Sequence, residues 1–151
     1  MADLLKTICY LAKLSKTPTI SDEEITNNRI NSVGVPLEKY IGKLFSNALE
    51  LDDVNEISRR FDKAIVYKGS KNHSPDFILR NGDAIEVKKI EGNPSTLQLN
   101  SSYPKAKLLK NDSRITQKAR ECEQWNEKEI IYAIGKKPKK TKKLESLWLI
   151  Y

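Results

Sequence analysis

The spacing of apolar residues changes near residue 62, and this change constrains the fold more than any other feature. Before residue 50 the spacing is helical. A continuous i, i+3, i+4 stripe follows Pro36 and consists of Leu37, Tyr40, Ile41, Leu44, Phe45, Ala48 and Leu49. From residue 62 the period changes, and several short apolar runs separated by turn residues follow, as in strands. The pattern predicts helices that pack on a following sheet, which is an α/β fold.

Two further helices are predicted ahead of this stripe. Apolar residues recur at helical spacing over residues 4–15, and Ser21-Asp22-Glu23-Glu24 matches a capping box that would begin a second helix. The striped helix should run from Pro36 to about residue 50. We expect residues 1–35 to be a helical segment packed on a core of residues 36–151, within a single domain.

The remaining elements are short. Strands are expected at residues 64–67, 76–80, 84–90, 129–134 and 144–151, and a helix at 114–124. A loop is expected at 69–75, and Gly135 should end the fourth of these strands. The order strand, helix, strand favours a parallel pairing through a crossover. The predicted core is α-β-β-β-α-β, a mixed sheet flanked by helices and preceded by N-terminal helices.

The pairing of strands 76–80 and 84–90 decides which side chains share a face. A two-residue Asn81-Gly82 turn would place Glu86 opposite Phe77 on an apolar face, which is unfavourable. An odd connection, Asn81-Gly82-Asp83 or a bulge, instead pairs Phe77 with Val87 and keeps apolar residues together. We therefore expect the odd connection.

This register predicts a polar site on the other face of the strand pair. Asp76 would lie opposite Lys88, with Glu86 two residues away on the same side. Adjacent carboxylates repel unless a cation lies between them, and oxygen ligands in a partly open site suit Mg²⁺. A lysine there can orient the attacking water while the metal stabilises charge on a phosphate. These residue types predict phosphodiester hydrolysis; the alternative is a solvated sheet face.

A family resemblance supports the catalytic interpretation. Ser74-Pro75-Asp76, followed after nine residues by Glu86-Val87-Lys88, resembles the PD-(D/E)xK nuclease motif, and the predicted element order resembles that superfamily's core. The resemblance implies that Asp76 and Glu86 hold divalent metal, that Lys88 assists the water, and that Glu38 is the additional acidic residue of the preceding helix. A glutamate in a first helical turn is also favoured by the macrodipole.

A closer similarity is to the NgoPII group of type II restriction endonucleases. It is carried by Gly92-Asn93, by residues 97–105, by Cys122-Glu123-Gln124-Trp125 and by Ile131-Tyr132-Ala133-Ile134-Gly135. This resemblance implies cleavage of double-stranded DNA at the short palindrome GGCC. Cutting both strands of a palindrome favours a homodimer of the full-length protein, and a companion DNA methyltransferase is a further candidate partner. Members of the group continue past a strand like residues 147–151, so we expect a C-terminal part to be missing.

DNA contacts are predicted beyond the motif. A cluster of hydrogen-bonding side chains precedes several lysines, and the candidate DNA-binding residues are Gln98, Asn100, Ser101, Ser102, Tyr103, Lys105, Lys107 and Lys89. The polar group could read base edges and the lysines could bind phosphates; the alternative is an ordinary polar loop. Trp125 and Trp148 flank apolar strands and are expected in the core.

The distribution of charge also favours a polyanionic partner. The net charge is +7, and residues 103–143 contain 13 Lys+Arg but only five Asp+Glu. The lysine run 136–143 fits either nonspecific phosphate contact or a solvated loop. Two other functions fit these features: a DNA repair or junction nuclease, and a non-catalytic basic module that binds nucleic acid.

Sequence features also limit the cellular setting. No apolar run approaches the ~18 residues of a membrane span, and the N-terminus has no signal-peptide pattern. Cys9 and Cys122 lie far apart without a CxxC or Cys/His grouping, which argues against a disulfide framework and a zinc site. We expect a cytoplasmic protein without a membrane partner.

Overall fold

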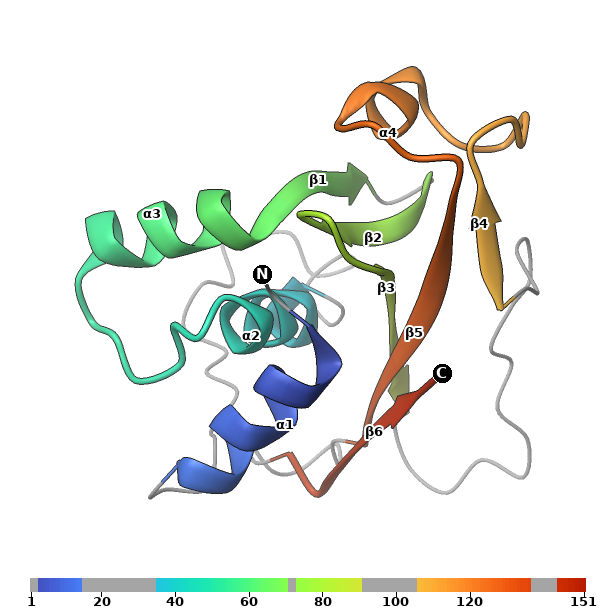
Figure 1. Cartoon of the computed structure of the whole chain (residues 1–151). Helices are drawn as coiled ribbons and strands as arrows, with labels where there is room; N and C mark the ends of the chain where they lie inside the picture. Colours follow the sequence, from blue (N-terminus) through green and yellow to red (C-terminus); the bar gives the residue numbers. More distant parts are fainter. Residues whose placement is uncertain (1–2, 15–34, 71–72, 91–105, 137–143) are drawn as a thin grey trace, which may run out of the picture.

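The computed structural model describes residues 3–14, 35–70, 73–90, 106–136 and 144–151. In chain order its elements are α1 (Leu4–Lys13), α2 (Val35–Phe45), α3 (Val54–Ala64), β1 (Ile65–Ser70), β2 (His73–Leu79), β3 (Ala84–Ile90), β4 (Lys107–Leu109), α4 (Gln117–Glu121), β5 (Glu127–Lys136) and β6 (Ser146–Ile150). The predicted helix beginning near Ser21 lies outside the described residues. Helices α1, α2 and α3 lie on one side of the strands, and α4 lies at one end of the molecule (Figure 1).

Within the described residues, the strands form one six-stranded sheet in the order β1-β2-β3-β5-β4, and β6 also pairs with β5. The β3 and β5 strands are parallel, as predicted, whereas the other pairs are antiparallel. β4 pairs with residues 127–129 of β5, and β6 pairs with residues 132–136. This arrangement confirms the α/β class: a mixed sheet flanked by helices in the manner of the restriction-endonuclease core, with helices at the N-terminal end.

The striped helix ends earlier than the sequence predicts. α2 stops at Phe45 because Asn47 adopts a left-handed conformation with φ of 54°. The Ala48 N–H then bonds the Lys43 carbonyl at 2.8 Å, a pattern that closes helix C-termini. The expected extension to residue 50 was therefore wrong, although Ala48 still packs in the core.

α3 was not predicted from the sequence. Asp53 caps it, because its carboxylate accepts hydrogen bonds from the N–H groups of Asn55 and Glu56. Phe61 anchors the helix to the sheet through an edge-on contact with Phe77, with ring centroids 5.9 Å apart. Its few apolar positions among many charges hide the helical periodicity from the sequence pattern.

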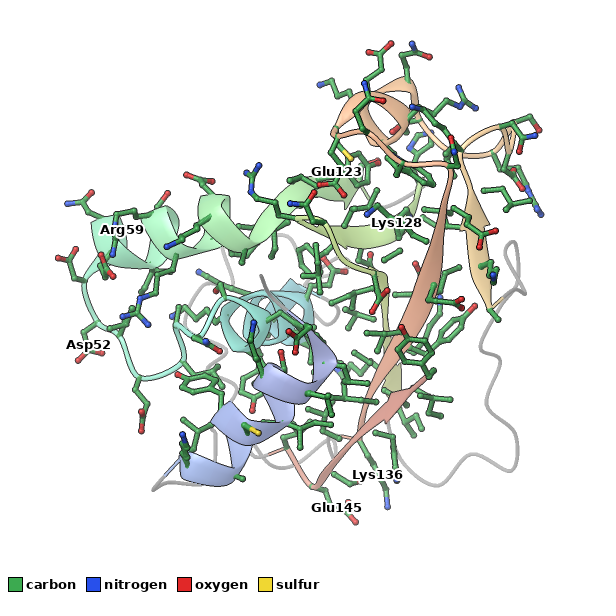
Figure 2. The ribbon with its side chains drawn as sticks, in the orientation of Figure 1. Asp52, Arg59, Glu123, Lys128, Lys136 and Glu145 are labelled. Carbon is green, nitrogen blue, oxygen red and sulfur yellow. The ribbon has the colours of Figure 1, made fainter. Side chains whose placement is uncertain are left out.

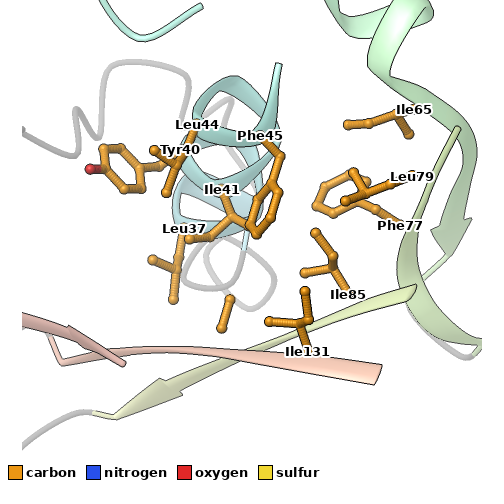
Figure 3. Close-up of a cluster of buried hydrophobic side chains, with 11 residues drawn as sticks. Leu37, Tyr40, Ile41, Leu44, Phe45, Ile65, Phe77, Leu79, Ile85 and Ile131 are labelled. Carbon is orange, nitrogen blue, oxygen red and sulfur yellow. The ribbon is translucent and has the colours of Figure 1, made fainter. Parts of the chain in front are cut away.

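Two apolar clusters cover the two faces of the sheet. The first lies between α2 and the sheet and includes Ile41, Phe77, Ile85 and Ile131, as Figure 3 shows. The second lies under α4 and contains Tyr67, Ile78, Leu108, Ile115, Ala119, Trp125, Ile130 and Tyr132 among others. Successive residues of β2 and β3 alternate between these clusters, as strand geometry requires. The predicted assignment of side chains to faces is therefore correct.

Several predicted strand and helix bounds were wrong. β1 extends to Ser70 and β2 starts at His73, so most of the expected loop 69–75 is strand. The expected helix 114–124 shortens to Gln117–Glu121, with Thr116 as its N-cap. β4 was not among the predicted strands, because its three residues form too short a run to show alternation.

Gly135 does not end its strand, which continues to Lys136. A Cβ at this glycine would lie 2.7 Å from a methyl group of Leu37, so the glycine permits close packing of α2 on the sheet. Of the two tryptophans expected in the core, Trp125 is buried but Trp148 is 44% exposed, because it lies on β6 at the margin of the sheet. Among the described residues, no helix has the length and apolar character needed to cross a membrane. Both cysteines are free thiols.

Candidate active site

The site begins where β2 and β3 separate. The two strands pair at Ile78 with Ala84 and at Phe77 with Ile85, and the next residues outward are Asp76 and Glu86. At that point a side-chain oxygen takes the place of a backbone carbonyl as acceptor, because Asp76 Oδ2 accepts a hydrogen bond from the Val87 N–H at 2.7 Å. The strands thus open at the two acidic residues.

The observed register differs by two residues from the predicted one. Phe77 faces Ile85 and not Val87, so Asp76 lies beside Glu86 and not opposite Lys88. The connection is odd, as expected, but it consists of Arg80, Asn81 and Gly82, since the Leu79 N–H bonds the Asp83 carbonyl at 2.9 Å. A two-residue shift leaves every side chain on its original face. The predicted group of Asp76, Glu86 and Lys88 therefore stays on one face despite the error.

Both oxygens of the Glu86 carboxylate have hydrogen-bond partners. Lys88 Nζ donates to Oε1 at 2.8 Å, and Ser74 Oγ donates to Oε2 at 2.8 Å. The Glu86 side chain is 16% exposed and that of Lys88 is 28% exposed, so this ion pair is partly shielded from water. Glu86 is thereby oriented from its own strand and from the strand opposite.

Asp76 is held differently. The pKa of Asp76 is raised to about 7, chiefly by burial and also by the negative charges of Glu86 and Glu38, whereas the Val87 hydrogen bond and Lys88 lower it. Asp76 therefore holds a proton more readily than an ordinary aspartate does. A carboxyl group with such a shifted pKa, beside a second carboxylate, is typical of a functional site.

Glu38 contributes from the helix layer. It lies in the first turn of α2, is partly buried, and raises the pKa of Asp76 through its charge. The structure thus brings together the four residues that the sequence singles out: Glu38 from α2, Asp76 from β2, and Glu86 and Lys88 from β3. Their roles remain predictions.

The donor chemistry suits a hard divalent cation. Two carboxylates from neighbouring strands supply oxygen ligands, and a bound cation would offset the burial and the like charge of Glu86 that raise the pKa of Asp76. Within the described part of the chain, no group of three or more His, Cys, Asp and Glu side chains has metal-binding geometry. A Mg²⁺ ion bound through one or two carboxylates and several waters needs no such group. Asp76 and Glu86 therefore fit as its protein ligands.

Only two of the predicted DNA-binding residues are described. Lys107 lies on β4, where its ammonium pairs with Glu127 at 2.7 Å and with Glu129 at 3.5 Å. Lys89 follows Lys88 on β3 and is partly buried. The others, Gln98, Asn100, Ser101, Ser102, Tyr103 and Lys105, lie outside the described residues.

Sequence reasoning assigned no role to Ser74. The serine lies two residues before Asp76 on β2, so alternation places both side chains on one face, and this parity was the signal that could have identified it. His73, next to it, is exposed and bonds Ser70 Oγ through Nδ1 at 2.9 Å.

Comparison with known proteins places the chain in a family. The family model described as NgoPII restriction endonuclease matches residues 2–151. The chain belongs to the NgoPII restriction endonuclease family. This agrees with the resemblance stated for the motif residues and for the sheet order, and type II restriction endonucleases generally use a divalent metal ion.

A named relative shows the same relationship. The chain is 43% identical over 143 residues to the type II restriction enzyme NgoPII of Neisseria gonorrhoeae, a match that covers 93% of this chain and 51% of that protein. The chain thus spans about half the length of this curated relative. No solved structure matches the chain significantly.

Proposed function

We propose that this family member is a Mg²⁺-dependent endonuclease that hydrolyses phosphodiester bonds of double-stranded DNA. The observation that carries the proposal is the opening of β2 and β3 at Asp76 and Glu86, with Lys88 bound to Glu86 at 2.8 Å. In this proposal residues 36–151 supply the nuclease core, and residues 1–35 pack on it.

Each side chain has a proposed role. Asp76 and Glu86 hold the metal, which lowers the pKa of water and stabilises negative charge on the phosphate when it is bound. Lys88, whose ammonium is already bound to Glu86, orients the attacking water. Ser74 keeps the Glu86 carboxylate in place by donating to Oε2. Glu38 adds negative charge at the helix side of the site, which favours cation binding.

The proposed partners follow from the family. Double-stranded DNA is the substrate, with GGCC as the proposed recognition site, and the family resemblance is its only support. Cleavage of both strands at a palindrome favours a two-fold dimer of the full-length protein, and a companion methyltransferase would protect the host DNA. Gln98, Asn100, Ser101, Ser102 and Tyr103 are proposed to read bases, and Lys105, Lys107 and Lys89 to contact phosphates.

The test is cleavage of a plasmid by the purified chain with Mg²⁺, followed by sequencing of the fragment ends. We expect ends at one short palindrome, no product with chelator, and binding without cleavage in Ca²⁺. Cutting confined to junctions or flaps would favour a repair nuclease instead. DNA binding that is the same with chelator and with Ca²⁺, without any cleavage, would favour a non-catalytic module.

A further inference from the structure

The end of the sheet opposite the opening contains a buried ion pair. Among the described residues, Lys128 of β5 is the one charged residue that the fold buries, with 5% of its side chain exposed. Its ammonium contacts Glu123 Oε1 at 2.6 Å and lies 5.8 Å from the centroid of the Trp125 ring. Figure 2 shows Glu123 and Lys128 at the end of the molecule where α4 lies.

This pair binds the backbone of the β2–β3 connection. Lys128 Nζ donates to the Gly82 carbonyl at 2.5 Å. Glu123 accepts the Asn81 N–H through both carboxylate oxygens, at 2.9 and 3.2 Å. Asn81 has φ of 52°, so the pair holds the part of the turn with the least common backbone conformation. Glu123 and Lys128, which lie more than forty residues further along the chain, therefore bind two consecutive residues of the turn.

A desolvated ion pair contributes little net stability, because removing both charges from water costs as much as their attraction returns. Structural specificity is a better-attested use of buried charge. The β2–β3 hairpin needs such specificity. A slip of two residues would pair Phe77 with Val87 and leave every apolar side chain on its own face, so burial alone does not exclude it.

We propose that the Glu123–Lys128 pair sets the register of β2 against β3 and thereby positions Asp76 beside Glu86. In the slipped register the turn would move to Asn81-Gly82-Asp83, and the groups that the pair binds would be displaced by one residue. Asp76 would then face Lys88 and lose the Val87 N–H. Glu123 and Lys128 are positioning residues, and their catalytic consequence rests on the proposed nuclease function.

Lys128 belongs to β5, the strand that pairs with β3. Two residues beyond Lys128, Ile130 of β5 lies in register with Ala84, the first residue of β3. The anchor and the strand that bears Glu86 thus belong to the same parallel pair, which continues in unbroken register to Ile90. A turn bound to β5 is consequently fixed relative to β3. The register of β2 against β3 is then set by where β2 leaves this turn.

The test is amide hydrogen exchange by NMR on the whole chain, without metal or DNA. The main variant carries Glu123→Met and Lys128→Met, because replacing a buried ion pair with apolar groups of similar size usually preserves folding. We expect protection of the Val87 amide to fall at least tenfold relative to that of Ile131 in the sheet centre. Contacts between Phe77 and Ile85 should weaken in the same spectra.

A second variant and a control keep the test decisive. Glu123→Gln preserves size and one acceptor, so it should fold and lower the relative Val87 protection about threefold. The control is Tyr67→Phe, which removes the 3.0 Å hydrogen bond to Thr116 and does not affect the turn. Tyr67 lies in the same apolar cluster as Trp125, and its substitution should leave the ratio of Val87 to Ile131 protection unchanged. Equal loss at Val87 and Ile131, or no loss at Val87 in Glu123→Gln, would overturn the inference.

Cleavage is measured separately on the same proteins. If the wild type cleaves DNA, kcat of the double variant should fall at least 100-fold, whereas Tyr67→Phe should stay within threefold. Absence of cleavage by the wild type would count against the proposed function, while the exchange ratios would still decide whether the pair sets the register. Full kcat together with a lowered Val87 ratio would overturn the link between register and site.

Discussion

The hydroxyl of Ser74 donates a hydrogen bond to Glu86 Oε2 at 2.8 Å, across the point where β2 and β3 separate. The other carboxylate oxygen is bound by Lys88. Glu86 is thus fixed in the absence of metal, whereas Asp76 beside it carries a pKa of about 7. Burial is the main cause of the raised pKa of Asp76, and the negative charge of Glu86 adds to it.

We predict that Asp76→Asn or Glu86→Gln reduces cleavage by at least ~100-fold while DNA affinity in Ca²⁺ stays within a few-fold. Each change removes a ligand charge at nearly constant volume. Cleavage is followed by single-turnover assays, with Asp52→Asn, an exposed carboxylate on the α2–α3 connection, as the control. Activity within a few-fold of wild type in either variant would remove the metal-ligand assignment.

Lys88→Ala should lower the single-turnover rate by roughly 10²–10⁴ with little change in DNA affinity, because a group that acts on the water contributes in the transition state. Lys89→Ala should do much less, since strand alternation directs its side chain to the other face. Equal effects of the two substitutions on the rate would show that the assignment of faces does not decide function.

Ser74→Ala should reduce cleavage by about tenfold, because losing one hydrogen bond to a charged group costs at least roughly 1.5 kcal/mol. The loss should appear as a higher Mg²⁺ concentration at half-maximal rate, because Glu86 loses one of its two orienting contacts. Ser70→Ala, which removes the bond to His73 on the neighbouring strand, is the control. An unchanged Mg²⁺ requirement would contradict a positioning role.

The stability of the metal-free protein should depend on pH through Asp76. Its pKa is about 7 in the folded chain and 3.8 in the reference state, so the folded chain binds the proton more tightly. Protonation of Asp76 therefore adds up to roughly 4 kcal/mol to the free energy of unfolding. This stabilisation is fully present below pH 3.8 and is lost as the pH rises to 7. Urea unfolding from pH 4 to 8 should show wild type losing stability relative to Asp76→Asn. A pH-independent difference would contradict the shifted pKa.

The lysine run and the polar loop should affect DNA binding differently. Both lie mainly outside the described residues, so this prediction rests on the sequence. Neutralising Lys136, Lys137, Lys139 and Lys140 together should weaken binding to all sequences and flatten the salt dependence by about 0.9 per lost phosphate contact.

Gln98→Ala or Asn100→Ala should instead reduce discrimination against altered sites by about 1–3 kcal/mol with an unchanged salt slope. Binding isotherms in Ca²⁺ at several salt concentrations separate the two. A uniform loss from the loop substitutions would reassign the loop to phosphate contact, and no loss from the lysine substitutions would leave that run as solvated surface.

Local pattern sufficed for several parts of the fold. The stripe after Pro36 identified the helix that covers the sheet, since helical spacing gathers Leu37, Ile41 and Leu44 on one face. It did not reveal where the helix ends, because the left-handed conformation of Asn47 depends on packing and capping. α3 escaped detection for a related reason: Phe61 is its main apolar anchor, and the ring it contacts belongs to β2.

For the candidate site, the sequence by itself determined which side chains share a face. Alternation with period two places Asp76, Glu86 and Lys88 together in either register, and it keeps Phe77 and Ile85 in the core. Only the tertiary structure decided that Asp76 lies beside Glu86 and bonds the Val87 N–H. The physical reason is that a two-residue slip leaves the burial pattern unchanged. The choice between the two registers falls to contacts on the turn, and these come from Glu123 and Lys128, which only folding brings to it.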